Sequence, residues 1–259
     1  MSSASSSPIQ FTAPAAPSTP TTSTPDDEVS YVEETRFGAW FLGTDTWFNF
    51  VVKVAVLDLV RLIGPRKRSY PVVVDVGCGR GRALRLLKIV LRAERLVGLD
   101  MDAKALEIAR RRAAAERDLQ VELLGSDLRA IDLPDASVDV VFCHQTLHHL
   151  VHQEKALDEF HRILKPGGLL LLAESTREYI HSWVIKLLFA HPMDVQKTAA
   201  EYLALLRRHG FEFDESNVSY PYLWWSRRDF GVLEALGIPP RRHGDREETL
   251  VNVAARKPG

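Results

Sequence analysis

A short glycine-rich segment, VVVDVGCGRG at residues 72–81, constrains this chain more than any other stretch of its sequence. It begins with an apolar run that is typical of a buried parallel strand, reaches an acid at Asp75, and then carries glycines at positions 77, 79 and 81. Glycine accepts the backbone conformations of a tight turn and leaves bare peptide groups facing a ligand. Apolar residues at helical spacing follow at positions 83, 84, 87 and 91. The segment therefore predicts a strand, a ligand-binding loop and a helix.

The glycine spacing discriminates between cofactors. A dinucleotide-binding loop, G-x-G-x-x-G, would carry its third glycine at position 82, where this chain has Arg82. A Walker loop, G-x-x-x-x-G-K-[ST], does not occur in the sequence. The acid two residues before G-x-G-x-G instead resembles the first motif of the class I S-adenosylmethionine (SAM)-dependent methyltransferases, and this resemblance implies SAM as the cofactor.

Further segments resemble this family in the family's own order along the chain. RAERLVGLD ends an expected second strand at Asp100, 25 residues after Asp75, near where a parallel α/β unit places a carboxylate for ribose hydroxyls. Asp102 is expected to cap the helix that follows. LQVELLGSDL, VDVVFCHQTLHHL, FHRILKPGGLLLLAES, EYLALLRRHGFEF and TLVNVAARK resemble the third to seventh strands, with FEF as the sixth. The resemblance covers about residues 70–257 and is closest to the type 11, or ubiquinone/menaquinone-biosynthesis, branch.

This resemblance implies a three-layer, Rossmann-like α/β fold. Its sheet has seven mostly parallel strands with one antiparallel strand, and helices cover both faces. The family pattern also implies that Asp100 binds the ribose and that Asp127 accepts from the adenine amine. A helix cap for Asp100 and an Asx turn for Asp127 are the alternatives. The expected cofactor-binding residues are Asp75, Gly77, Cys78, Gly79, Asp100, Met101, Ser126, Asp127, Leu128 and Cys143.

The loop after the fourth strand is expected to hold a catalytic base. In open α/β sheets ligands bind beyond the carboxyl ends of the strands, so this loop borders the crevice. Histidine titrates near neutral pH and can remove a proton from a hydroxyl or an acidic carbon. Relatives often carry a polar active-site residue at the position that matches His148, so His148 is the first candidate and His144 the second. The alternative is that neither is catalytic.

The same loop disfavours one class of methyltransferase. Enzymes that act on the exocyclic amines of bases carry an Asn/Asp-Pro-Pro-Tyr/Phe segment after the fourth strand. The corresponding residues here read His144-Gln145-Thr146-Leu147. Nucleic acid is therefore not an expected partner, and the near balance of 33 basic and 34 acidic residues gives no global basic footprint either.

Aromatic residues in three segments are candidates for the wall of an acceptor pocket. They lie in an expected helical cap over the carboxyl ends of the strands, at residues 29–69, and in expected substrate-region insertions at about 176–196 and 221–245. Such residues fit an apolar or aromatic acceptor or a peripheral membrane contact. Packing against the domain is the alternative for the cap. The candidate substrate-binding residues are Tyr31, Trp40, Gln145, Tyr179 and Trp183.

The rest of the chain indicates where in the cell the protein is expected and whether it needs a membrane span, a disulfide or a metal. Residues 1–28 are rich in Ser, Thr, Ala and Pro, so a disordered tail is expected, and they lack the basic start and apolar centre of a signal peptide. Charged residues interrupt the longest apolar region, residues 37–63, which excludes an ordinary membrane span there. Two cysteines form no disulfide framework and no zinc site. A cytoplasmic location without a metal is expected.

The sequence thus predicts methyl transfer from SAM to a small-molecule acceptor, on oxygen or carbon, by a methyltransferase domain at residues 70–259. A monomer and a homodimer both fit. The alternatives are a methyltransferase for protein or RNA, and a catalytically silent SAM-binding or partner-binding module. The identity of the acceptor is not encoded legibly.

Overall fold

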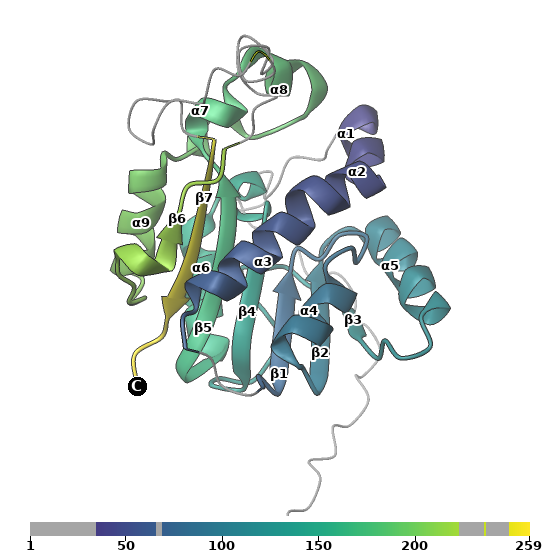
Figure 1. The fold of residues 1–259 in the computed structure, drawn as a ribbon, viewed down its shortest axis with the longest axis vertical. Helices are drawn as coiled ribbons and strands as arrows, with labels where there is room; N and C mark the ends of the chain where they lie inside the picture. Colours follow the sequence, from purple (N-terminus) through teal and green to yellow (C-terminus); the bar gives the residue numbers. More distant parts are fainter. Residues whose placement is uncertain (1–34, 66–68, 223–235, 237–248) are drawn as a thin grey trace, which may run out of the picture.

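The computed structural model describes residues 35–65, 69–222, 236 and 249–259, and a seven-stranded sheet forms its centre (Figure 1). The strand order is β3-β2-β1-β4-β5-β7-β6. Neighbours among β1 to β5 run parallel, whereas β7 runs antiparallel to β5 and β6. This confirms the predicted fold. The strands are β1 (Val72–Val76), β2 (Arg95–Asp100), β3 (Glu122–Gly125), β4 (Val138–His144), β5 (Leu164–Ser175), β6 (Val218–Ser219) and β7 (Leu250–Arg256).

Three predictions lie wholly or mostly outside the described residues: the tail at 1–28, Tyr31, and the second insertion at about 221–245. Among the described residues, no helix combines the length and the apolar character that crossing a membrane requires.

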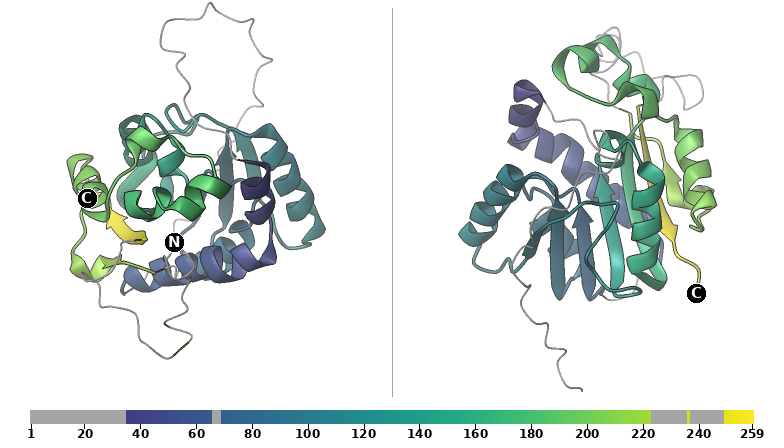
Figure 2. Two further views of the ribbon diagram at one scale, coloured as in Figure 1. Left: turned by 90° about the horizontal axis from the view of Figure 1, so that it is seen from above. Right: turned by 180° about the vertical axis from the view of Figure 1, so that it is seen from behind.

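Helices cover both faces of the sheet (Figures 1 and 2). The buried side chains form two large clusters, one on each face, because strands covered on both sides bury every second residue in opposite directions. One face carries α3 (Lys53–Leu62), α4 (Leu84–Leu91) and α5 (Ala103–Ala115), and the other carries α6 (Gln153–Ile163) and α9 (Ala199–Arg208). The helix predicted after the glycine loop is α4. The predicted cap of α5 is also confirmed, since the Asp102 side chain accepts a hydrogen bond from the Lys104 N–H.

The sixth strand is not where the sequence pattern placed it. In the segment Phe211–Phe213, Glu212 makes only an isolated bridge to Arg256. Phe211 is 2% exposed and points into the core, and Phe213 packs under the Arg207 guanidinium, so the two rings serve packing against α9 rather than a sheet edge. The chain then passes through a short 3-10 helix, Glu215–Asn217, before the two-residue β6 pairs with β7.

The amino-terminal segment caps the strand ends only in its first part. It forms α1 (Arg36–Phe41), α2 (Asp45–Trp47), a π-helical turn at Phe48–Val52 and then α3. The first two helices lie beyond the carboxyl ends of the strands, whereas α3 runs across a face of the sheet (Figure 1). It does so because its apolar stripe packs on β5, β7 and α4, and because Asp58 accepts hydrogen bonds from Ser219 and Asn252 of the last two strands.

Candidate cofactor and acceptor site

One cavity opens at the carboxyl ends of β1 and β4. The order of the strands reverses there, since β1 lies between β2 and β4, and open α/β sheets bind ligands at this switch point. Its volume is about 300 Å³, which is within the range of small-molecule pockets. Its lining comes from four places: the cap (Ala39, Leu42, Trp47, Val52), the glycine loop (Asp75, Gly77, Cys78, Gly79, Arg80, Arg82, Ala83), the β2 end (Asp100, Met101, Asp102, Ala105) and the β3 and β4 loops (Leu128, Phe142, His144, Gln145, Thr146, His149, Leu150).

Gly77 and Gly79 of the glycine loop both have positive φ, but they differ in the space around them. Gly77 has φ of +70°, and a Cβ atom there would lie 2.2 Å from Thr146 Oγ1, so the loop after β4 packs directly on this residue. Gly79 has φ of +51°, but a Cβ atom there would meet nothing within 4 Å. The loop is therefore closed against the protein at Gly77 and open toward the cavity at Gly79.

Asp75 places a carboxyl group at the cavity floor without a compensating partner. Its side chain is 3% exposed, and its Oδ2 atom makes no hydrogen bond to any described residue. Burial, and after it the negative charge of Asp100, raises the pKa of Asp75 well above its usual range. A buried, unpaired carboxyl group costs free energy unless a donor or a cation reaches it. The ammonium and sulfonium charges of SAM would supply such a cation, so this residue fits that cofactor.

Asp100 orients the glycine loop and still faces the cavity. Its Oδ2 accepts from the Gly79 N–H at 2.7 Å, and its Oδ1 accepts from the Asp102 N–H at 2.8 Å. Burial raises the pKa of Asp100 despite these bonds. A carboxylate has about four acceptor positions, so two remain for the hydroxyls of a ribose. Both the helix-capping and the ribose interpretations are thus compatible with its geometry.

Arg82 stands where a dinucleotide-binding loop would have a glycine, and its side chain contacts the cap. Its Nη1 pairs with Asp45 at 2.7 Å, and its Nη2 donates to the Gly43 carbonyl. Hydrogen bonding to Arg82 in turn lowers the pKa of Asp45. The side chain that breaks the dinucleotide pattern therefore fastens the cap to the glycine loop, and this contact lies beside the wall that Leu42 and Trp47 form.

The end of β4 and the turn after it bring two histidines, His144 and His149, to the cavity wall. His144 stacks on Phe142 and meets Trp47 edge-on, with ring centroids 6.3 Å apart. Its Nε2 is buried without a partner in the described structure, and burial lowers its pKa to about 4. His149 lies further along the same wall. A neutral imidazole and an apolar ring therefore face the same space as the glycine loop.

Comparisons with known proteins agree with this geometry. Residues 74–172 match the methyltransferase domain family model. A probable S-adenosylmethionine-dependent methyltransferase of Mycolicibacterium smegmatis is 33% identical over 152 residues, which are 56% of this chain and 53% of that protein. The demethylmenaquinone methyltransferase of Thermus thermophilus is 36% identical over 102 residues, 39% of this chain and 46% of that protein. Residues 74–172 of this chain therefore form a methyltransferase domain. It spans about half the length of these two relatives.

A solved structure shows the same fold over more of the chain. It is a putative methyltransferase in complex with the Trm112 methyltransferase activator of Haloferax volcanii, with a TM-score of 0.60 and 22% identity. The similarity covers 85% of this chain and 93% of that one. At this identity it supports the fold alone.

The methyltransferase domain does not bring every expected cofactor residue to its cavity. Leu128 lines it, but Asp127 does not, and both Asp127 oxygens take hydrogen bonds from Arg129, which lower its pKa. Ser126 donates to the Asp127 carbonyl. Cys143 is fully buried beside Glu174, at 3.6 Å, and burial raises its thiol pKa. Asp75, Gly77, Cys78, Gly79, Asp100, Met101 and Leu128 are gathered at the cavity.

The first-ranked catalytic candidate lies behind the cavity wall. His148 is 2% exposed, and its Nδ1 is 2.6 Å from Glu174 Oε2. Within the described part of the chain it is not among the residues that line the cavity, whereas His144 is. Gln145, held with φ of +53°, does line it; its Oε1 accepts from Ser175, while its Nε2 is buried without a described partner.

The aromatic candidates are divided in the same way. Trp40 is 62% exposed and Trp183 56% exposed, while Tyr179 is buried in a separate small cluster. None of these three is among the described residues that line the cavity. The cap instead contributes Trp47 to the cavity lining. The sequence carries one signal for it, which is that Trp47 lies in the same aromatic-rich stretch as Trp40.

Proposed function

We propose that this chain transfers the methyl group of SAM to a small-molecule acceptor, on an oxygen or a carbon atom. The observation that carries the proposal is that Asp75 and His144 line one cavity, and that the buried Oδ2 atom of the first and Nε2 atom of the second make no hydrogen bond to any described residue. The first fits a cationic cofactor, and the second fits an acceptor that must lose a proton. The name of the Thermus relative, a demethylmenaquinone methyltransferase, supports a small acceptor.

The cofactor side follows from the residues on the glycine loop and β2. Asp75 offsets positive charge, the open face of Gly79 admits a close ligand, and Asp100 offers its remaining acceptor positions. SAM supplies a methyl group that is already activated by its sulfonium centre. The protein must then mainly hold the acceptor in line at near-attack distance, an effect worth up to about 7–11 kcal/mol.

His144 is the base that the geometry favours. Because its pKa is lowered to about 4, its imidazole is neutral at physiological pH and its Nε2 can accept a proton from a hydroxyl or an acidic carbon. General-base help contributes about 10²–10⁴-fold when the pKa of the base lies near the working pH, so a base with a pKa of about 4 supplies the lower part of this range. Trp47 meets this ring edge-on, with ring centroids 6.3 Å apart. His148, ranked first from the sequence, lies behind this wall.

Mass spectrometry tests this function directly. The protein is incubated with SAM and a metabolite extract, and the products are searched for a metabolite that has gained one methyl group. A SAM-dependent product that His144→Gln makes at least about tenfold more slowly supports the proposal. SAM binding by calorimetry without any product would indicate the silent module, and methyl label in protein or RNA would indicate a macromolecular acceptor.

A further inference from the structure

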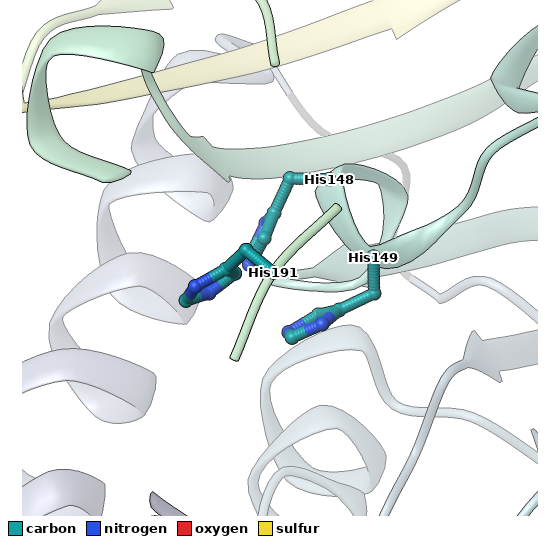
Figure 3. A group of neighbouring side chains, drawn as sticks. All are labelled: His148, His149 and His191. Atoms are coloured by element: carbon teal, nitrogen blue, oxygen red, sulfur yellow. The ribbon is translucent and has the colours of Figure 1, made fainter. Parts of the chain in front are cut away.

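Three histidines from two separate segments converge beside the cavity (Figure 3). His148 and His149 belong to a 3-10 turn, Leu147–His149, and His191 follows the short helix α8 (Trp183–Leu188). The ring centroids are 4.3, 4.9 and 5.1 Å apart. One nitrogen atom from each ring lies within 4.8 Å of the others. No described acid or cysteine belongs to this group.

Glu174 fixes the orientation of one of these rings. Its carboxylate is fully buried and accepts from the N–H groups of Thr146 and Leu147 at 3.0 and 2.7 Å. Its other oxygen meets His148 Nδ1 at 2.6 Å. This contact favours the tautomer that carries its proton on Nδ1, in which the Nε2 lone pair points away from Glu174. A buried carboxylate that holds one imidazole nitrogen in this way is the usual outer partner of a metal-ligating histidine.

The other two rings bring their nitrogens to the same place. His149 Nδ1 is buried and has no hydrogen-bond partner among the residues that the structure describes. Imidazole nitrogens ligate metal ions through their lone pairs. The three rings thus bring one nitrogen each to one small volume.

We propose that His148, His149 and His191 bind a divalent transition-metal ion of the Zn²⁺ type, with one coordination position left open. Imidazole ligands suit zinc, copper, iron and nickel, and three protein ligands with an open fourth position are typical of zinc sites that act on a substrate. A tetrahedral ion with Zn–N bonds of about 2.0–2.1 Å needs nitrogens about 3.4 Å apart. The three nitrogens lie within 4.8 Å of one another, so the side chains must rotate to close a gap of at most about 1.4 Å.

Such an ion would lie at the wall of the cavity that His149 lines. An oxygen bound at its open position would become more acidic, which favours a hydroxyl acceptor. That use of the site rests on the proposed function, whereas metal binding itself does not.

Zinc titration of the tag-free protein, in competition with a chromophoric chelator and without SAM, tests the site. We expect one Zn²⁺ per chain in the wild type and affinity at least 100-fold weaker in His191→Gln. His181→Gln is the matched control, because His181 belongs to the same insertion but lies outside the cluster, and it should bind zinc as the wild type does. Co²⁺ substitution should give the intense visible spectrum of a tetrahedral site, and His191→Gln should lose it.

Equal zinc affinity in the wild type and His191→Gln would overturn the proposal, because any bound ion would then lie elsewhere. Glu174→Gln provides a second variant, for which a loss of about 10–100-fold is expected while the three ligands remain. Circular dichroism establishes that each variant is folded. Calorimetry with SAM on the same samples separates the metal proposal from the proposed function. If the protein binds SAM but does not bind zinc, only the metal site is rejected. If it binds zinc but does not bind SAM, only the proposed function is rejected.

Discussion

Replacing Gly77 with alanine tests how the glycine loop is held against the loop after β4. The new Cβ would lie 2.2 Å from Thr146 Oγ1 and 2.3 Å from its Cγ2, so Thr146 must move. The φ of +70° costs alanine about 1–2 kcal/mol. Displacing Thr146 also weakens its N–H bond to the buried Glu174 carboxylate, a bond of a kind worth about 1.5–3 kcal/mol. Together these terms predict a loss of about 2.5–5 kcal/mol.

Gly79→Ala is the matched control for this substitution. Gly79 also has positive φ, but its Cβ would meet nothing within 4 Å, so only the backbone term of about 1–2 kcal/mol applies. For a domain of this size, each kcal/mol lowers Tm by about 2–4 °C. Differential scanning calorimetry should therefore show a fall of about 5–20 °C for Gly77→Ala and about 2–8 °C for Gly79→Ala.

Equal losses in the two variants would refute the reasoning, because the contact with Thr146 would then carry no energy. The double variant Gly77→Ala, Thr146→Ala supplies a further check. It removes the two closest atoms, so it should recover about 0.5–3 kcal/mol relative to the sum of the single changes.

Three further substitutions address the cavity. Asp100→Ala should weaken SAM binding at least tenfold, since a charge-assisted hydrogen bond is worth about 1.5–3 kcal/mol; unchanged affinity by calorimetry in a folded variant would remove Asp100 from the site. Trp47→Ala should slow methyl transfer about tenfold or more while Trp40→Ala changes it little, and equal rates in product assays would reject the assignment of the wall. Burial lowers the pKa of His144 from 6.5 to about 4, so between these values the unfolded chain binds a proton that the folded chain does not. The free energy of unfolding should fall as the pH drops through this window, by about 1.4 kcal/mol per pH unit for this one proton, and His144→Phe should flatten the slope in denaturant titrations.

The sequence predicted the cofactor half of the site because its signals are local. Asp75 and Asp100 each end a parallel strand, and the ends of neighbouring parallel strands meet at one edge of the sheet. The acceptor half depends on tertiary packing that no periodicity reveals. Trp40 and Trp47 lie in one aromatic-rich stretch, and the break between α1 and α2 decides which of them faces the cavity.

The position of the sixth strand was misjudged for the same reason. The alternation Phe-Glu-Phe fits a strand, but the same spacing also lets Phe211 enter the core and Phe213 stack under an arginine beside α9. The sequence expectation of no metal stays a prediction; it considered only cysteines, whereas the ligands of the proposed site are histidines. His191 joins His148 and His149 only because the insertion after β5 folds back over the loop after β4, and spacing along the chain gives no sign of that path.

The hydrogen bonds of Asp58 link the order of synthesis to the order of folding. This carboxylate belongs to α3, near the start of the described chain. Besides Arg61 of its own helix, its partners are Ser219 and Asn252, and Asn252 is 194 positions away. While the ribosome is still making the middle of the protein, α3 has no β7 to pack on, and the half-buried Asp58 has only Arg61 as a donor. The contacts of α3 are therefore complete only once residue 252 has emerged, so a nascent chain carries the glycine loop long before this helix is fully held.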